Sequence, residues 1–215
     1  GYARIHQDIC VNCGLCTVSC PFAAISDKSE IVQVTFSLLE RKQERSSSKL
    51  HAIVAPSFTG QFGNKVTPEI IFAGIQLLGF DRVMEVAYGA VCDTILLVEK
   101  YTTKQGKFLG TSCCPSWVMT AQNSYPDLTD NIADSFTPMV ETAKKIKESD
   151  VNAKVIFIGP CIAKKYEALT PEVSGYVDHV LTFEELAALF VAFEIDLSTI
   201  DESPAIQDAS MLGRG

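Results

Sequence analysis

From Leu50 onward the chain alternates short apolar segments with stretches that have the periodicity of amphipathic helices. The apolar segments are nearly continuous and rich in β-branched or aromatic residues, as expected of strands that are buried on both faces. They cover residues 51–56, 82–88, 107–113, 154–160 and 176–181. Strands that alternate with helices predict an α/β fold, in which a parallel sheet is flanked by helices.

Several of the intervening helices have clear start signals. Residues 67–69 combine an N-cap threonine, a proline at the first helical position and an acid in the first turn, and Gly79 provides a stop signal. Residues 137–138 begin another helix, and Thr182 with Glu185 forms a capping box. In such a fold the carboxyl ends of the strands meet at one edge of the sheet, where ligands gather.

The first 30 residues differ from the rest of the chain. They are rich in cysteine and hold too little apolar material for a core of their own, so a bound cluster or a neighbouring domain is needed to fold them. Residues 40–49 are charged and rich in serine, which predicts a solvated helix end and an exposed connector. We therefore predict a small domain over residues 1–48 and the α/β domain over residues 49–215.

The charge of the chain limits its partners. The 215 residues have a formal net charge of -8, which repels phosphate backbones and anionic lipids, so we expect neither nucleic acid nor a membrane as a partner. No apolar segment is long enough to cross a membrane, and the N-terminus lacks the basic and apolar parts of a secretory signal. We therefore expect a cytoplasmic protein with reduced thiols.

Four of the eight cysteines form the run Cys10-x2-Cys13-x2-Cys16-x3-Cys20, which a proline follows. Closely spaced thiolates on a loop that contains glycine can surround one cuboidal cluster, and this spacing is typical of bacterial ferredoxins. It predicts a 4Fe-4S cluster and electron transfer, with a zinc knuckle or free thiols as the alternatives. Because only one such run is present, Cys20 either completes this cluster or serves a second one.

Two further cysteine segments follow predicted strands: TSCCPSW at 111–117, the first signature loop, and GPCIAKKYE at 159–167, the second signature loop. Adjacent Cys113 and Cys114 cannot readily form a disulfide, and at a strand end their side chains point in opposite directions. Lys164 can reach back as a donor toward an anionic ligand. The spacing favours a metal or redox site, and buried structural cysteines are the alternative.

These two loops resemble the first two H-cluster signatures of iron-only hydrogenases, whose usual forms are TSCCPGW and MPCxxKxxE. The segment APSFTGQFG at 55–63 resembles a further stretch that lines the same pocket, and the ferredoxin run fits the electron-transfer domain of that family. The resemblance covers nearly the whole chain. It implies the first lobe of a hydrogenase H-domain, preceded by a small ferredoxin-like iron-sulfur domain.

The resemblance also implies residue roles. Cys114 and Cys161 would be thiolate ligands of the H-cluster, a 4Fe-4S cluster linked to a di-iron centre with CO and cyanide ligands. Cys113 would exchange protons with the di-iron half, and Glu99 would be the first carboxylate of the proton relay. Soft thiolates suit iron-sulfur sites, and a relay needs groups that exchange protons near neutral pH.

Three further residues would contact the di-iron half. Lys164 and Ser57 would each donate a hydrogen bond to a cyanide ligand, and Pro56 would line the pocket.

The chain also departs from the family pattern. Gly159 takes the place of the usual methionine, and Ser116 that of the usual glycine. The second relay carboxylate falls on Thr102, and a relay serine falls on Ala133. The third signature, a segment of the Cys-Gly-Gly-Cys type that supplies the last two thiolates, does not occur. We therefore expect that residues 1–215 alone do not form an active hydrogenase.

The predicted function is that of an iron-sulfur oxidoreductase resembling iron-only hydrogenase, which reversibly reduces protons to H2 with electrons that pass through a 4Fe-4S cluster. The expected partners are a ferredoxin or similar carrier, the hydrogenase maturation proteins and the remaining C-terminal part of the enzyme, in the cytoplasm of an anaerobe. A hydrogen-sensing regulatory protein and a hydrogenase-like iron-sulfur assembly factor are the alternatives.

Overall fold

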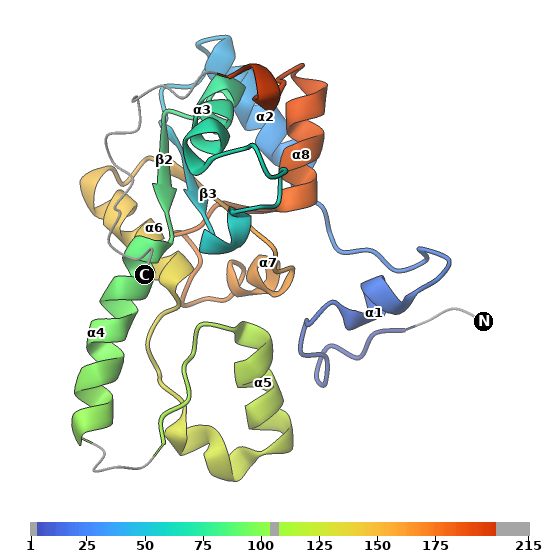
Figure 1. The fold of residues 1–215 in the computed structure, drawn as a ribbon. Helices are drawn as coiled ribbons and strands as arrows, with labels where there is room; N and C mark the ends of the chain where they lie inside the picture. The colour runs from blue at the N-terminus through green and yellow to red at the C-terminus, as the bar shows by residue number, and fades with distance from the viewer. Residues whose placement is uncertain (1–3, 104–107, 201–215) are drawn as a thin grey trace.

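The computed structural model describes residues 4–103 and 108–200. At its centre lies a four-stranded parallel sheet in the order β2-β1-β3-β4 (Figure 1). The strands are β1 (Leu50–Val54), β2 (Arg82–Glu85), β3 (Lys154–Gly159) and β4 (His179–Thr182). The register pairs His51 of β1 with Arg82 on one side and with Val155 on the other. The expected α/β fold with a parallel, helix-flanked sheet is confirmed.

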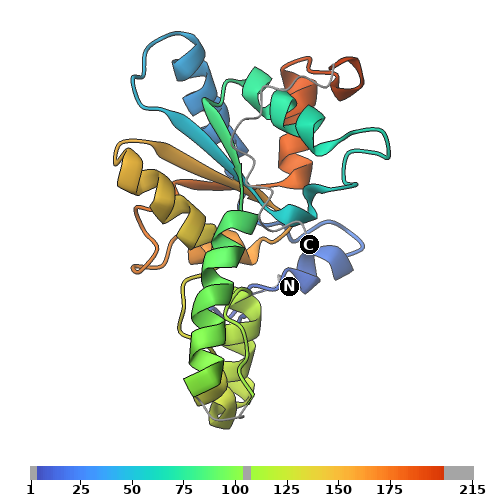
Figure 2. The ribbon, with the colours of Figure 1, turned by 60° about the vertical axis from the view of Figure 1, so that its left-hand side comes forward.

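Helices cover both faces of the sheet (Figure 2). α6 packs on β1 and β3, whereas α8 packs on β3 and β4 and contacts α2 and α3. The α-helices are α1 (Leu15–Ser19), α2 (Ile31–Lys42), α3 (Pro68–Leu78), α4 (Ala87–Thr103), α5 (Pro115–Ser124), α6 (Pro138–Ser149), α7 (Ala163–Glu167) and α8 (Phe183–Ala192). The 3-10 turns are η1 (Pro56–Phe58), η2 (Pro126–Asn131) and η3 (Leu197–Thr199). None of these helices combines the length and the apolar character that crossing a bilayer requires.

The predicted helix signals are present. The Thr67 side chain accepts a hydrogen bond from the amide of Ile70, and α3 stops at Gly79, whose φ of 120° favours glycine. Thr182 and Glu185 form the complete capping box of α8. Both ends of α3 and the start of α8 therefore lie where the sequence predicts them.

The strand expected at 107–113 is wrong. Residue 107 lies outside the described residues, and residues 108–113 form no strand but a single isolated bridge between Gly110 and Ile132. Phe108 is 56% exposed, so the apolar segment does not enter the sheet. It leads instead to α5 at the edge of the molecule.

The core lies on the sheet and extends to α2. All five residues of β1 are buried, and Val34 and Leu38 of α2 belong to the same core. α2 therefore packs on the α/β lobe, and the charged connector that follows Lys42 is largely exposed, as expected. The domain limits at 48 and 49 stay a prediction, and residues 201–215 of the predicted lobe lie outside the described residues.

The carboxyl ends of the strands point toward the lower part of the molecule in Figure 1. α4, α5 and η2 extend beyond the sheet on this side, and the N-terminal segment with α1 lies beside them (Figures 1 and 2). α4 is attached to the lobe through its contact with α6. This arrangement brings both signature loops and the N-terminal cysteines to one edge of the fold.

Candidate iron-sulfur site

Cysteines from three segments line one cavity of about 360 Å³, which we call the thiol cavity. Cys113 and Cys114 come from the first signature loop, Cys161 comes from the second, and Cys13 comes from the N-terminal run. The expectation that a strand end turns Cys113 and Cys114 in opposite directions is wrong, because no strand forms there and both residues line this cavity. Lys164 lines the same cavity. The structure thus brings together four sequence-predicted metal or proton-exchange residues and the predicted cation.

The two signature loops are shaped by the elements that follow them. Cys114 is the N-cap residue of α5, with Pro115 at the first helical position. Cys161 lies two residues after the end of β3 and two residues before α7 begins. Burial, and to a smaller extent the neighbouring thiol of Cys114, raises the pKa of Cys161 while Lys164 opposes this change. A metal ion or cluster, which binds the thiolate, would lower that pKa again.

Lys164 connects the two loops. Its side chain is buried, and its Nζ donates to the carbonyl oxygen of Cys113 at 3.1 Å and to Glu167 Oε2 at 2.7 Å. Glu167 is itself 8% exposed, so the pair is shielded from water. Sequence reasoning missed Glu167, although the E of the MPCxxKxxE pattern could have indicated it. Because Glu167 compensates its charge, the ammonium group of Lys164 can stand at the wall of the thiol cavity without an unpaired charge being buried.

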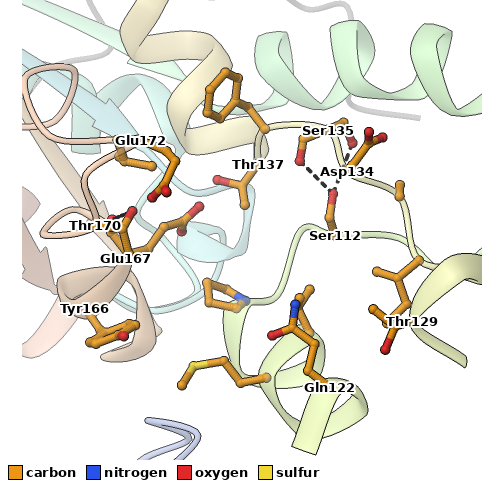
Figure 3. A pocket seen from close by; sticks show the side chains of 17 residues that line it. Ser112, Gln122, Thr129, Asp134, Ser135, Thr137, Tyr166, Glu167, Thr170 and Glu172 are labelled. Atoms are coloured by element: carbon orange, nitrogen blue, oxygen red, sulfur yellow. Dashed lines mark hydrogen bonds between the residues drawn. The ribbon is translucent and has the colours of Figure 1, made fainter. Parts of the chain in front are cut away.

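Glu167 of this ion pair also lines a second cavity, of about 650 Å³, which we call the serine cavity (Figure 3). Ser112 and Ser135 lie side by side at its wall, with their hydroxyl oxygens 3.0 Å apart. Ser135 Oγ donates in turn to Asp93 Oδ1 at 2.7 Å, and Asp93 is 4% exposed. A buried carboxylate of α4 is thereby connected to the residue that precedes Cys113.

Three predicted site residues lie outside these cavities. Glu99 is exposed on α4, and Pro56 and Ser57 are exposed in η1, directly after β1. None of the three lines the thiol cavity or the serine cavity. Sequence reasoning selected Glu99 on α4 and missed Asp93 on the same helix, where a single acid within the apolar stretch AVCDTILLV was the available signal.

The glycine at the methionine position has a structural reason. A Cβ atom on Gly159 would lie 2.6 Å from the ring of Phe157 and 3.1 Å from the Cβ of Ala55. Phe157 is a buried residue of the sheet core, so its ring occupies the space that a larger side chain would need. This departure from the family pattern is therefore coupled to the packing of β3.

Two of the N-terminal cysteines line a third cavity, also of about 360 Å³, which we call the N-terminal cavity. Cys10 and Cys16 line it together with Ile162 and Lys165. Backbone amides, chiefly that of Ala24, lower the pKa of Cys20, which favours the thiolate that binds iron.

The donor chemistry fits iron-sulfur clusters. All eight cysteines are free, and soft thiolates are the ligands such clusters take. Within residues 4–103 and 108–200, no three His, Cys, Asp or Glu side chains are close enough to share a metal ion. A cluster held by the run would need its cysteines closer together than they lie here.

Comparison with known families agrees with these features. The sequence profile described as "Iron only hydrogenase large subunit, C-terminal domain" matches residues 48–215. The profile described as "4Fe-4S binding domain" matches residues 3–26. The two matches correspond to the α/β lobe and to the N-terminal cysteine run.

Individual relatives fall into two groups. Iron hydrogenase 1 of Clostridium pasteurianum is 30% identical over 86% of this chain, which spans 35% of that protein. The periplasmic [Fe] hydrogenase large subunit of Nitratidesulfovibrio vulgaris is 30% identical over 94% of this chain, which spans 60% of it. The cytosolic Fe-S cluster assembly factor NAR1 of Kluyveromyces lactis is 30% identical over 48% of this chain, which spans 22% of that factor. The chain thus covers less than two thirds of each of these relatives.

Proposed function

The chain belongs to the iron-only hydrogenase family, and we propose that it contributes the electron-entry domain and the first two ligands of a hydrogenase that interconverts protons and H2. The observation that carries the proposal is the thiol cavity, in which Cys113, Cys114, Cys161 and Lys164 meet beside the N-terminal cysteine run. An H-cluster bound there would supply the redox change and the binding of the reacting hydrogen. The remaining thiolates would come from the rest of the complete enzyme.

Each side chain has a proposed role. Cys114 and Cys161 hold the metal centre as thiolates, and Cys113 holds the proton that is passed to or from the reacting site. Lys164 donates to an anionic ligand from the wall of the cavity, where Glu167 keeps its ammonium group in place. Ser57 would donate to a cyanide ligand from η1, and Pro56 would line the pocket. Glu99 would be the first carboxylate of the proton relay.

Electrons would enter through a 4Fe-4S cluster held by Cys10, Cys13, Cys16 and Cys20. The donor would be a ferredoxin or a similar low-potential carrier, and maturation proteins would deliver the metal centre. We place the protein in the cytoplasm of an anaerobe, with no nucleic-acid or membrane partner.

The first experiment uses the purified chain, reduced under anaerobic conditions. Iron and sulfide analysis with EPR spectroscopy should show one 4Fe-4S signal, and Cys13→Ser should remove it. Cys92→Ser is the matched control, because Cys92 lies on α4, away from the run, and the signal should persist. Zinc in place of iron would contradict the electron-entry role.

A second candidate is an iron-sulfur assembly factor, which the relatives named for that role favour. The two functions differ in the di-iron centre. Infrared bands from CO and cyanide in the complete, matured protein would support the hydrogenase, and their absence after maturation would support the assembly factor.

A further inference from the structure

The thiol cavity and the N-terminal cavity share a wall. Gly14, Thr17 and Ile162 line both of them. Gly14 has a φ of 76°, and a Cβ atom at this position would lie 2.7 Å from Ile162 Cδ1. The backbone between Cys13 and Cys16 therefore rests directly on the side chain that follows Cys161. The positive φ favours glycine at this position, and with any larger residue the end of the Ile162 side chain would have to shift.

A buried ion pair cluster lies next to this wall. Lys165 is 7% exposed, and its Nζ donates to Asp27 Oδ2 at 2.6 Å and to both carboxylate oxygens of Glu185 at 3.0 Å. Burial opposes the charge, but the hydrogen bonds to Asp27 and Glu185 raise the pKa of Lys165. We call Lys165, Asp27 and Glu185 the Lys165 cluster. It connects the N-terminal segment to the capping box of α8.

Two neighbouring contacts reinforce the connection. Ser29 Oγ donates to Glu185 Oε1 at 2.5 Å, and the amide of Val180 donates to Glu30 Oε2 at 2.8 Å. Residues 27–30 are thus bound to the lobe by hydrogen bonds to charged groups, which are stronger than neutral ones. No residue of the short helix α1 is buried, so these contacts carry much of the attachment of the N-terminal segment.

We propose that Lys165 is a positioning residue for electron transfer: through Asp27 and Glu185 it holds the N-terminal segment so that Gly14 stays in contact with Ile162. This inference rests on the proposed function. One electron would leave the reduced N-terminal cluster, which a low-potential one-electron carrier re-reduces, and would reduce the metal centre at Cys114 and Cys161. Electron tunnelling slows steeply with distance, so the contact of Gly14 with Ile162, beside Cys13 at the edge of the thiol cavity, keeps the two proposed sites close together.

The first test measures amide hydrogen exchange in the purified chain. Lys165→Met leaves two carboxylates without their cation, and residues 14–30 should exchange about tenfold faster or more while β1 is unchanged. Asp27→Asn keeps the Lys165–Glu185 pair and should give a smaller increase in the exchange rate of the same residues. If Lys165→Met does not fold, Asp27→Asn alone tests the inference. Lys145→Met is the matched control, since the Lys145–Glu148 pair is exposed on α6. Unchanged exchange of residues 14–30 in Asp27→Asn and Lys165→Met would overturn the inference.

A second test separates positioning from simple stabilisation. In the complete, matured protein reduced with dithionite, the EPR signal of the N-terminal cluster relaxes faster when a second paramagnetic centre is near. Lys165→Met and Gly14→Ala should both make this signal saturate at lower microwave power, and Lys165→Arg should restore the wild-type behaviour. Unchanged saturation in both variants would contradict the inference even where hydrogen exchange changes. If the wild-type chain binds no cluster, the proposed function fails, whereas hydrogen exchange still tests the attachment.

Discussion

All five residues of β1 are buried, whereas the 17 residues of α4 include three buried ones, namely Ala87, Gly89 and Asp93. The sheet is held by many apolar contacts that act together. The edge with the signature loops is held by a few polar groups, among them Lys164 and Asp93. The sheet should therefore tolerate the loss of single contacts, while the edge should depend on individual side chains.

The largest effect is expected from the ion pair that joins the two loops. Lys164→Met leaves the carboxylate of Glu167 buried without its partner and should lower the free energy of unfolding by about 3–5 kcal/mol. Urea unfolding measures the change. The double variant with Glu167→Gln should recover part of the loss, because the uncompensated charge is removed. A double variant no more stable than Lys164→Met would show that the edge does not depend on this charge.

The attachment of α4 to the lobe provides the next test. A Cβ atom on Gly89 would lie 2.1 Å from the carbonyl oxygen of Pro138, so Gly89→Ala should separate α4 from α6. We expect a loss of about 3 kcal/mol in unfolding free energy, measured by urea unfolding. Ile95→Ala, at a side chain 64% exposed on the same helix, should change it by less than about 0.5 kcal/mol. Equal effects of the two substitutions would contradict the comparison.

The packing of Phe157 against Gly159 provides a third test, at the end of β3, where the sheet meets the edge with the signature loops. Gly159→Met should cost about 1–3 kcal/mol because the new side chain collides with the ring. Phe157→Val creates room, so the double variant should be more stable than the sum of the two single effects predicts, by about 0.5–3 kcal/mol. If thermal and urea unfolding show that the effects of the two substitutions simply add, Phe157 is not the reason why residue 159 is a glycine.

The smallest effect concerns pH and the sheet itself. Burial, together with the charge of Arg82, lowers the pKa of His51 below its usual range, and neither ring nitrogen makes a hydrogen bond within the described part of the chain. Below a pH of about 6.5 the unfolded chain therefore binds a proton that the folded chain excludes. The contribution of His51 to the free energy of unfolding is therefore fully present above that pH and is lost as the pH falls below it.

Between pH 7.5 and 5.5, His51 should account for about 1 kcal/mol of lost stability, which His51→Phe should remove. Urea unfolding at the two pH values measures it, with His6→Phe, at an exposed histidine, as the control that keeps the dependence. An unaltered pH dependence in His51→Phe would show that the sheet does not exclude the proton.

The sequence predicted the structural features that depend on residues close together along the chain. Continuous apolar segments indicated the four strands, and Thr67 and Thr182 marked helix starts through contacts three residues away. The segment 107–113 has the same composition, but composition does not show whether a partner strand is available.

Contacts between distant residues left no local signal. Ser135 is 42 residues from Asp93, and Lys165 is 138 residues from Asp27. The loops with cysteines were found because their spacing reflects the chemistry of thiolate ligands. The hydrogen bonds that hold those loops in place required the fold.

Cys13 has a consequence for the order in which metal must arrive. Its thiol opens into the cavity of Cys113, Cys114 and Cys161, while Cys10 and Cys16 line the neighbouring one. If the thiol cavity holds the proposed metal centre, iron that arrives there first would find the thiol of Cys13 beside those of Cys113, Cys114 and Cys161. An N-terminal cluster formed earlier would already bind Cys13 and would leave the thiol cavity to its own ligands. On the proposed function, loading would therefore begin at the N-terminus.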